Sequence, residues 1–510
     1  MSRNHWIVAA VLIMAWIFGH ASRVAAARYD GRLTITVVDQ QSGQRIAARM
    51  ELRDRRGRAV RVKPQGAVSL GNSFVFDGEA TLELRRGAYR FLIEAGPEYQ
   101  TRPGHFTMER HAEDSTQIAL LRRVNMRDEG WWAGDLDVSR RLQQMPLLMR
   151  ASGVDLAPVA VAANIRGKCR QEKIPANEAI SELSPPLFGP WAALDQRRGG
   201  GLLFLFADAP VDVCNASAEG PSLPMLRAAS AAGADVVALT PFAWDLPLWI
   251  ASGKLDAIQI IHRHALRDGV VDNEGWGRAR DKTFYPGKLG NGRWTEAIYH
   301  HVLNCGLRIA PAAGSGAGFN QNPVGTNRVY VHCGRQFTRD AWRRGLREGR
   351  VTVTNGPLLR TRVEGHPPGH LFQLEPGESR DFQIALQLTF YKQSPVEYLE
   401  VVKNGRTLYE VRLDELAQQQ GRLPPVHFDG SGWFLVRAMT SNAKTYQFAS
   451  TGPYYVESEY QRRISRTSVQ FFLDWLDDAA EKFAGNAAVR AEIEAARPFW
   501  QDLLAQANAD

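Results

Sequence analysis

The hydrophobic pattern of this chain changes twice along its length, and these changes restrict the fold more than any other feature. From about residue 31 to 122, apolar and polar residues alternate in short runs separated by turn residues, which is typical of a β-sandwich. From about 125 to 358, continuous apolar runs alternate with helical stretches, which favours parallel strands covered by helices on both faces. Alternating strands return from about 359 to 457. The pattern predicts several folded units in a row.

The central region carries predicted strands that alternate with predicted helices. The strands are short apolar runs at residues 157–162, 201–206, 234–239 and 256–261. The helices are expected at residues 141–152, 222–232, 245–252 and 295–305. In folds of this kind the chemistry lies where the carboxyl ends of the strands meet the following loops. Site residues are therefore expected at the ends of the apolar runs.

The carboxyl-terminal residues from about 465 to 507 predict two helices, because apolar residues recur there at helical spacing. The apolar face of the first helix is formed by Phe471, Phe472, Trp475 and Leu476. Residues 499–504 repeat this spacing. One interpretation is a helix pair that binds a partner or a membrane surface. The other, which we favour because the helices are rich in acidic residues, is a hairpin that packs back on the protein.

The amino-terminal residues 1–27 have the layout of a secretory signal peptide. Arg3 supplies positive charge, residues 6–19 form an apolar run, and residues 25–27 are three alanines. The apolar run is shorter than the roughly 20 residues that a bilayer span needs. We expect cleavage and a secreted or periplasmic location. The alternative is an uncleaved anchor. No later stretch of the sequence predicts a membrane span.

Charge and composition narrow the possible partners. The chain has 510 residues and a formal net charge of +8. One basic cluster contains Arg53, Arg55, Arg56, Arg58 and Arg61. Such a cluster forms either an anion-binding patch or, more commonly, a solvated strand face. Because no aromatic residues interleave with it, nucleic acid is not an expected partner. No pattern predicts an oligomeric state.

The four cysteines are Cys169, Cys214, Cys305 and Cys333. They allow three full disulfide pairings in an exported chain, and their positions do not select one of them. No two of them form a Cys-x-x-Cys pair, so a structural zinc site is not expected. We expect buried or disulfide-bonded cysteines.

Five segments between residues 124 and 359 carry a family resemblance. They are residues 130–137 (GWWAGDLD), 146–151 (PLLMRA), 304–315 (NCGLRIAPAAGS), 322–331 (NPVGTNRVYV) and 349–358 (GRVTVTNGPL). In this order and spacing they resemble exported metallohydrolases of the CehA/McbA type, within the polymerase-and-histidinol-phosphatase (PHP) superfamily. In addition, residues 86–91 (RGAYRF) are similar to strands of carboxypeptidase-regulatory-like domains.

The resemblance implies a fold and a chemistry. The implied fold is multidomain α/β plus all-β: a distorted PHP-like β/α barrel at residues 123–358, related to the seven-stranded PHP barrel. Two β-sandwich modules flank it at residues 28–122 and 359–457, and a helical tail follows at residues 458–510. The implied chemistry is metal-assisted hydrolysis of an ester, carbamate or phosphoester. It would use two or three divalent ions such as zinc, manganese or iron.

The sequence departs from the family pattern at the metal positions. Asp137 and Ser139 stand where the family carries two histidines, and Gly316 stands where it places an aspartate ligand. A carboxylate can bind a divalent ion, a serine hydroxyl is a poor ligand, and glycine has no ligand atom. Two functions stay open. We favour a weakly active or inactive homologue that binds a small-molecule or carbohydrate ligand. The alternative is an active hydrolase with an altered ligand set.

The remaining candidate metal ligands are Asp135, Asp137, His262 and His264. Alternate residues on an extended segment point the same way, so each pair is able to reach one cation. The alternative for the carboxylates is hydrogen bonding within a loop. The alternative for the histidines is a chance position on a polar loop, with no metal bound. No catalytic residue is assigned.

A ligand site is expected near the same strand ends, formed by Arg140, Asn320, Trp131 and Trp132. Arg140 follows the lost imidazole pair, where a fixed cation would hold an anionic group. Tryptophan rings suit stacking on sugars. Further aromatic residues expected around this site are Trp244, Trp249, Trp276, Tyr285 and Trp294. The alternative is that these rings are core residues. The long loop at residues 268–294 is expected to cover the site.

Overall fold

The amino-terminal part of the chain forms two small sheets, in which all strand pairs are antiparallel except β1 with β8. The computed structural model describes residues 29–173, 185–209, 211–390 and 395–510. One sheet has the order β5-β1-β8 and the other the order β3-β4-β2-β6-β7. These strands are β1 (Gly31–Asp39), β2 (Ala48–Asp54), β3 (Val68–Leu70), β4 (Ser73–Phe76), β5 (Glu79–Leu84), β6 (Gly87–Glu94), β7 (Arg102–Met108) and β8 (Glu113–Leu120). Alternate side chains of β5 are buried, as its period-2 pattern predicts.

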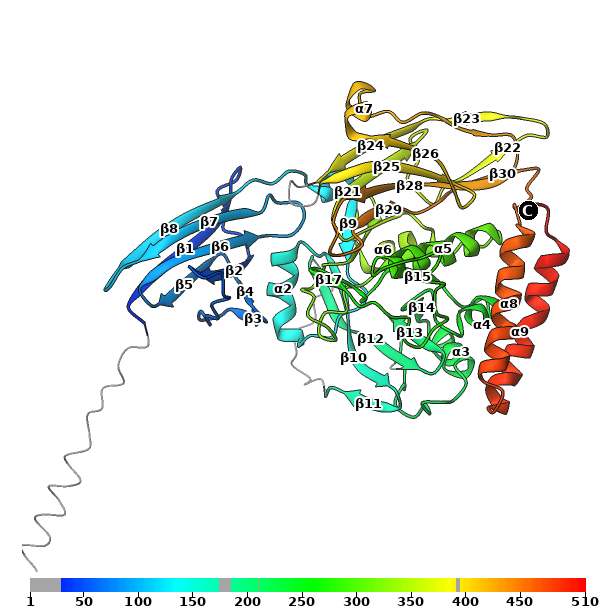
Figure 1. Cartoon of the computed structure of the whole chain (residues 1–510), viewed down its shortest axis with the longest axis horizontal. Helices are drawn as coiled ribbons and strands as arrows, with labels where there is room; N and C mark the ends of the chain where they lie inside the picture. Colours follow the sequence, from blue (N-terminus) through cyan, green and yellow to red (C-terminus); the bar gives the residue numbers. More distant parts are fainter. Residues whose placement is uncertain (1–28, 174–184, 210, 391–394) are drawn as a thin grey trace, which may run out of the picture.

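The central part is a curved sheet with helices around it (Figure 1). Seven of its strands have the order β18-β15-β14-β13-β12-β10-β9. They are β9 (Trp131–Gly134), β10 (Leu156–Ile165), β12 (Leu187–Arg197), β13 (Gly200–Leu205), β14 (Asp235–Ala238), β15 (Ala257–Ile261) and β18 (Ala310–Ala313). The helices are α2 (Met145–Ser152), α3 (Leu223–Ala231), α4 (Leu246–Ala251), α5 (Gly290–Asn304) and α6 (Arg339–Arg347). Each strand and helix predicted in this region is present.

Short elements connect these strands and helices. They are the 3-10 helices η1 (Met126–Glu129) and η2 (Leu142–Gln144) and the strands β11 (Lys168–Gln171), β16 (Ala265–Leu266) and β17 (Gly269–Val270). β11 pairs with the end of β10. β16 and β17 form a separate small hairpin. β11 and the β16–β17 hairpin thus follow the carboxyl ends of β10 and β15. The sequence predicted the loops of the site at these strand ends.

The prediction of an all-parallel central sheet is wrong, and within the seven-strand run the exception is β13. β10 pairs in parallel with β12, and β14 pairs in parallel with β15, but β13 is antiparallel to both of its neighbours. Only Arg198 and Gly199 separate β12 from β13. A two-residue connection joins only antiparallel strands, because a parallel return needs a crossover of a dozen or more residues. The central sheet is therefore mixed.

Backbone hydrogen bonds join the two edges of this seven-strand run. The chain continues from β9 beyond Gly134, and there Leu136 N donates to Ala313 O at 3.4 Å. Ser139 N donates to Ala317 O at 2.7 Å. Val138 lies in parallel bridges with both Val159 and Ala317. The extension of β9 therefore lies between β10 and the chain that follows β18.

All four residues of β9 also pair with β19 (Arg328–His332), and β19 pairs with β20 (Val351–Thr354). From β20 the same sheet continues through β29 (Phe448–Thr451), β28 (Gly432–Thr440), β25 (Val396–Lys403) and β26 (Arg406–Arg412). The other elements of this part are β21 (Leu358–Val363), β22 (Leu371–Leu374), β23 (Arg380–Phe382), β24 (Ile384–Thr389), β27 (Val426–Phe428), β30 (Tyr454–Ser458) and α7 (Leu413–Gln418). The central and carboxyl-terminal strands thus share one hydrogen-bonded sheet. The described chain as a whole is a mixed α/β structure with several sheets.

The last two helices, α8 (Arg466–Lys482) and α9 (Ala487–Ala505), form a hairpin that packs on the central part (Figure 1). Phe472, Trp475 and Trp500 are fully buried there. Trp500 stacks on Phe472 with ring centroids 4.5 Å apart, and its indole N–H donates to Pro247 O in the first turn of α4. The apolar face of the hairpin is therefore used for internal packing, which agrees with the favoured interpretation.

The predicted signal peptide at residues 1–27 lies outside the described residues. Across the described ranges, every helix is too short or too polar to cross a bilayer.

The helical hairpin gives a direct test of this packing. Trp500→Ala removes a fully buried ring and leaves a cavity, so we expect a loss of about 3–5 kcal/mol in the free energy of unfolding. The measurement is urea denaturation followed by circular dichroism. Phe284→Ala is the control, because Phe284 is 77% exposed and its removal is expected to change stability by less than about 0.5 kcal/mol. Equal losses in the two variants would contradict the packing of α9.

Candidate functional site

Asp135 lies just beyond β9, and its fully buried carboxylate is surrounded by hydrogen-bond donors. It accepts from the backbone N–H of Ser315 at 2.9 Å, from the Ser315 hydroxyl at 2.5 Å and from the backbone N–H of Gly325 at 2.7 Å. Burial raises the pKa of Asp135 to about 6 despite these donors. The carboxylate therefore holds the loop after β18 and the Asn-Pro-Val-Gly segment against the end of β9.

Asp137 is paired with an arginine from the predicted histidine segment. Its carboxylate is fully buried, and Arg263 Nε donates to Oδ2 at 2.8 Å while Arg263 Nη2 donates to Oδ1 at 2.6 Å. The guanidinium also lies 4.4 Å from the ring centroid of Phe319, and its Nη1 donates to Gln196 Oε1 at 3.3 Å. Both carboxylate oxygens of Asp137 are thus occupied by a bidentate cation, a geometry that only arginine provides.

The space beside Gly316 is occupied by atoms of Arg263 and Asn320. A Cβ atom at Gly316 would lie 2.6 Å from the Cβ of Arg263 and 2.7 Å from Nδ2 of Asn320. The backbone of Gly316 has φ +69°, a conformation that favours glycine. An aspartate, which the resemblance implies at this position, would therefore require the backbone near residue 263 and the Asn320 amide to shift.

His262 and His264 lie together, but in a turn rather than on the extended segment that the sequence predicted. Their ring centroids are 5.0 Å apart, and both rings pack on Phe242 with centroids 5.4 Å away. His262 Nε2 is hydrogen-bonded to Thr295 Oγ1 at 3.0 Å, and His262 Nδ1 accepts from the backbone N–H of His264 at 3.4 Å. Burial and, to a smaller extent, the Arg263 charge lower the pKa of both imidazoles, to about 4 for His264. Both rings are therefore neutral near pH 7.

The residues present do not fit a cluster of divalent ions. A catalytic zinc site uses three protein ligands and keeps its carboxylates and imidazoles free to face the ion. Here the oxygens of Asp137 bind Arg263, the oxygens of Asp135 bind Ser315 and Gly325, and both ring nitrogens of His262 have hydrogen-bond partners. The described ranges contain no group of three or more His, Cys, Asp or Glu placed to hold one ion.

Asn320 is used to hold the loop backbone. Its amide donates to the carbonyl oxygens of Arg263 at 3.1 Å and Ser315 at 3.0 Å, and its side-chain oxygen accepts from Asn322 N. Asn327 donates in the same way to the carbonyls of His262 and Gly314. These asparagines therefore fix the segments that carry the candidate site, and the Asn320 amide is already occupied.

Arg140 is half-buried, and its Nε has no hydrogen-bond partner among the described residues. Burial lowers its pKa. Arg263, rather than Arg140, supplies the cation that faces Asp137.

Trp131 and Trp132 begin β9, six and five residues before Asp137. At about 3.3 Å per residue, Trp131 lies roughly 20 Å from Asp137 along an extended chain. Trp131 is buried against His332, with ring centroids 5.1 Å apart. Trp132 stacks on Phe337 at 4.3 Å and donates its indole N–H to the backbone of Gly334. Both rings pack at the opposite end of the strand from the aspartates.

The other predicted aromatic residues divide into two groups. Trp249 and Trp294 are buried, whereas Trp244, Trp276 and Tyr285 are half-buried. Trp276 belongs to the predicted covering loop, and Arg166 lies 4.7 Å from its ring centroid at the turn after β10. Trp276 is therefore in contact with the loop that leaves the end of β10.

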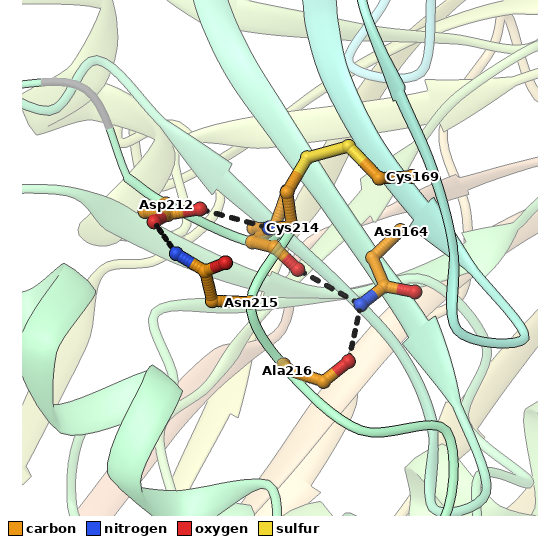
Figure 2. The surroundings of a disulfide bond; sticks show 7 residues. Asn164, Cys169, Asp212, Cys214, Asn215 and Ala216 are labelled. Atoms are coloured by element: carbon orange, nitrogen blue, oxygen red, sulfur yellow. Dashed lines mark hydrogen bonds between the residues drawn. A yellow bond between two sulfur atoms is a disulfide. The ribbon is translucent and has the colours of Figure 1, made fainter.

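A disulfide holds two loops together next to the end of β10. Figure 2 shows Cys169 of β11 bonded to Cys214, with Asn164 of β10 beside them. The Asn164 amide donates to the carbonyl oxygens of Val213 and Ala216 at 2.8 Å each. Cys305 and Cys333 are unpaired, and burial raises the pKa of both thiols. Of the pairings that the sequence left open, the structure contains Cys169–Cys214.

The sequence interpretation missed Arg263, which lies between the two histidines. A signal was present, because a basic residue between the two candidate imidazoles is an unfavourable neighbour for a divalent cation. Residues 262–265 form a turn closed by a hydrogen bond from Ala265 N to His262 O at 2.9 Å. In this turn Arg263 faces Asp137, while the imidazoles face Phe242.

The ion pair predicts a large response to one substitution. Arg263→Met leaves the Asp137 carboxylate buried without a cation, so we expect a loss of about 3–5 kcal/mol in the free energy of unfolding. The double variant Asp137→Leu/Arg263→Met buries no charge and should recover part of this loss. Urea denaturation measures both. Arg58→Met is the control, since it breaks an exposed ion pair with Asp54 that contributes less than about 1 kcal/mol. A loss no larger than in this control would contradict the buried pair.

His264 predicts a loss of stability in acid. Its pKa is about 4 in the fold against 6.5 for a free imidazole. Between these pH values the unfolded chain binds a proton that the folded chain does not, so stability falls as the pH falls, by up to about 3 kcal/mol. His264→Gln removes this contribution, and the free energies of unfolding at pH 7 and 4.5 should then differ less. His427→Gln, on an exposed side chain, should keep the wild-type difference. A wild-type difference in His264→Gln would refute the assignment.

Comparison with known proteins assigns neither a family nor an activity. No family model and no curated protein matches the chain. A β-glucuronidase from Parabacteroides merdae aligns over 83% of this chain and 63% of its own length, with 11% identity and a TM-score of 0.16. β-Glucuronidase 3 of Bacteroides uniformis aligns over 86% and 64%, with 8% identity and a TM-score of 0.17. The four amino-terminal Ig domains of Dscam1 isoform 8.4 align over 83% and 96%, with 9% identity and a TM-score of 0.13. This chain spans less than two thirds of the glucuronidases, and at such TM-scores these matches support no conclusion.

Proposed function

We propose that this chain is an exported, PHP-like relative of the CehA/McbA-type metallohydrolases in which an ion pair has replaced the metal centre. In this proposal the chain binds a ligand and does not hydrolyse one through a metal-bound water. Export rests on the signal-peptide layout of residues 1–27.

The observation that carries the proposal is the bidentate pair between Asp137 and Arg263. Asp137 occupies the position of one lost histidine of the family motif. A guanidinium there supplies positive charge to the same carboxylate that a divalent ion would bind. The glycine at position 316 is a separate departure, because the Cβ contact there would be made by any residue other than glycine at position 263.

The strand arrangement supports a PHP-like barrel. Seven central strands follow one another in the sheet, and hydrogen bonds of Leu136 and Ser139 join its two edges. Asp135, Asp137, His262 and Ser315 all follow the carboxyl ends of these strands. In β/α barrels this is the end that carries function.

One observation favours the competing function, a metal-dependent hydrolase with an altered ligand set. The His262 and His264 rings lie 5.0 Å apart, and His264 Nδ1 has no hydrogen-bond partner among the described residues. One free imidazole nitrogen supplies a single ligand, whereas a catalytic zinc ion requires three protein ligands. The ligand-binding role therefore has the stronger support.

Metal analysis tests the proposal. The purified chain, after dialysis, should contain much less than one equivalent of zinc, manganese or iron, and its melting temperature should not change when these ions are added. The variant Asp137→His/Ser139→His/Arg263→Ala restores the imidazole pair of the family motif and removes the competing cation. Its melting temperature should rise with zinc.

The metal content and turnover of the wild-type chain decide between the two functions. One equivalent of retained metal, together with chelator-sensitive turnover of phosphoesters or carboxyl esters, would establish the hydrolase function instead. A parallel assay with added zinc, manganese or iron covers the possibility that metal is lost during purification.

A further inference from the structure

A cleft of about 700 Å³ lies where the amino-terminal sheets, the central part and the carboxyl-terminal strands meet. Its volume is in the range of small-molecule sites, which measure about 300–1,000 Å³. It is lined by residues of β6, by the end of α2, and by the segments at residues 323–326 and 354–357. The last two belong to the Asn-Pro-Val-Gly and Thr-Asn-Gly-Pro motifs, so two motifs that the candidate site leaves largely unexplained face one cleft.

Arg328 gives this cleft an unbalanced positive charge. The residue is 5% exposed, and among the described residues no carboxylate lies within ion-pair distance of its guanidinium. Its Nη1 donates to the carbonyl oxygens of Ser152 at 2.9 Å and Gly153 at 3.2 Å, and its Nε donates to Gly325 O at 2.7 Å. Among the described residues its Nη2 has no acceptor within hydrogen-bond geometry, although the guanidinium lies near the Tyr330 hydroxyl and opposes the rise in the pKa of that group that burial causes.

The carbonyl partners neutralise only part of this charge. Ser152 ends α2, so Arg328 lies at the negative end of the helix dipole. That end carries roughly half an elementary charge. The remaining charge and the Nη2 donors are available to an anion that enters the cleft.

The other charges of the cleft balance one another. Arg49 and Arg267 both pair with Glu51 and Glu94, so two guanidinium groups meet two carboxylates. Exposed side chains of opposite sign, Asp268 and Lys444, also line the cleft. The positive charge of Arg328 is therefore not balanced by these pairs.

One wall of the cleft is apolar and aliphatic. Leu70 and Leu92 come from the amino-terminal sheets, and Leu148 and Ala151 come from α2. Leu70 and Leu92 are half-buried, so their side chains still present surface to the cleft. Among the described lining residues there is no aromatic ring on which a sugar would stack.

We propose that this cleft binds a small amphiphilic anion, with its negative head group on Arg328 and its aliphatic body along Leu70, Leu92 and Leu148. An unpaired guanidinium beside an aliphatic wall matches the two halves of such a molecule. This inference deepens the proposed ligand-binding function and rests on it.

Octanoate is the probe for the test, because it combines one carboxylate with an aliphatic chain. Isothermal titration calorimetry on the full purified chain should show binding at one site. Acetate lacks the aliphatic body and 1-octanol lacks the charge, so each should bind at least tenfold more weakly. Leu92→Glu places a negative charge on the apolar wall and should weaken octanoate binding at least tenfold. Arg328→Gln removes the head-group contact and should do the same.

Leu408→Glu is the matched control, because Leu408 is 45% exposed on β26 and does not line the cleft. It should bind octanoate like the wild type. If Arg328→Gln does not fold, Leu92→Glu carries the test, since its target is a half-buried wall residue. Failure of the wild type to bind octanoate, or wild-type binding by Leu92→Glu, would overturn the proposal. Neither result changes the metal content that tests the proposed function, so the two failures are distinguishable.

Discussion

The pair between Asp137 and Arg263 joins two segments that lie 126 residues apart in the chain, the extension of β9 and the turn after β15. Two opposite charges attract strongly where water is excluded, but removing them from water costs nearly as much. Such a pair therefore contributes little net stability and strongly penalises any arrangement that separates its partners. Phe319 lies against the paired guanidinium, while Asn320 and Gly316 contact the backbone carbonyl and the Cβ of Arg263.

A second buried carboxylate links this site to the cleft. Asp135 accepts from the backbone N–H of Gly325, and the carbonyl of the same residue accepts from Arg328 Nε. Gly325 has φ +76°, and a Cβ there would lie 2.5 Å from Cγ2 of Val154. Only glycine fits between the two charged groups. Gly325 is therefore in contact with both charged groups through its backbone.

The sequence predicted most strands and helices of the central part because burial on both faces leaves continuous apolar runs. β12 was missed because Gly189 and Pro190 interrupt its pattern, and both residues are usually depleted in strand interiors. Because β12 was not predicted, the antiparallel orientation of β13 was not predicted either. In the site, the proximity of the two imidazoles was predictable, although the segment expected to be extended is a turn. The ion pair was not, because its partners are distant in sequence and the resemblance directed attention to metal ligands.

Buried or half-buried arginines lie at the junctions between the parts of the molecule. Arg267 binds Glu51 and Glu94 of the amino-terminal sheets, and Arg437 of β28 binds Glu296 of α5. Arg198 binds Asp245 at the start of α4, while its guanidinium lies over the ring of Phe483 after α8. Bidentate or doubly paired guanidinium groups fix orientation as well as distance. The apolar cores supply stability, and these pairs specify how the cores are placed. A cleft at such a junction has walls that are fixed before a ligand arrives, so binding there costs less ordering entropy than at a mobile interface.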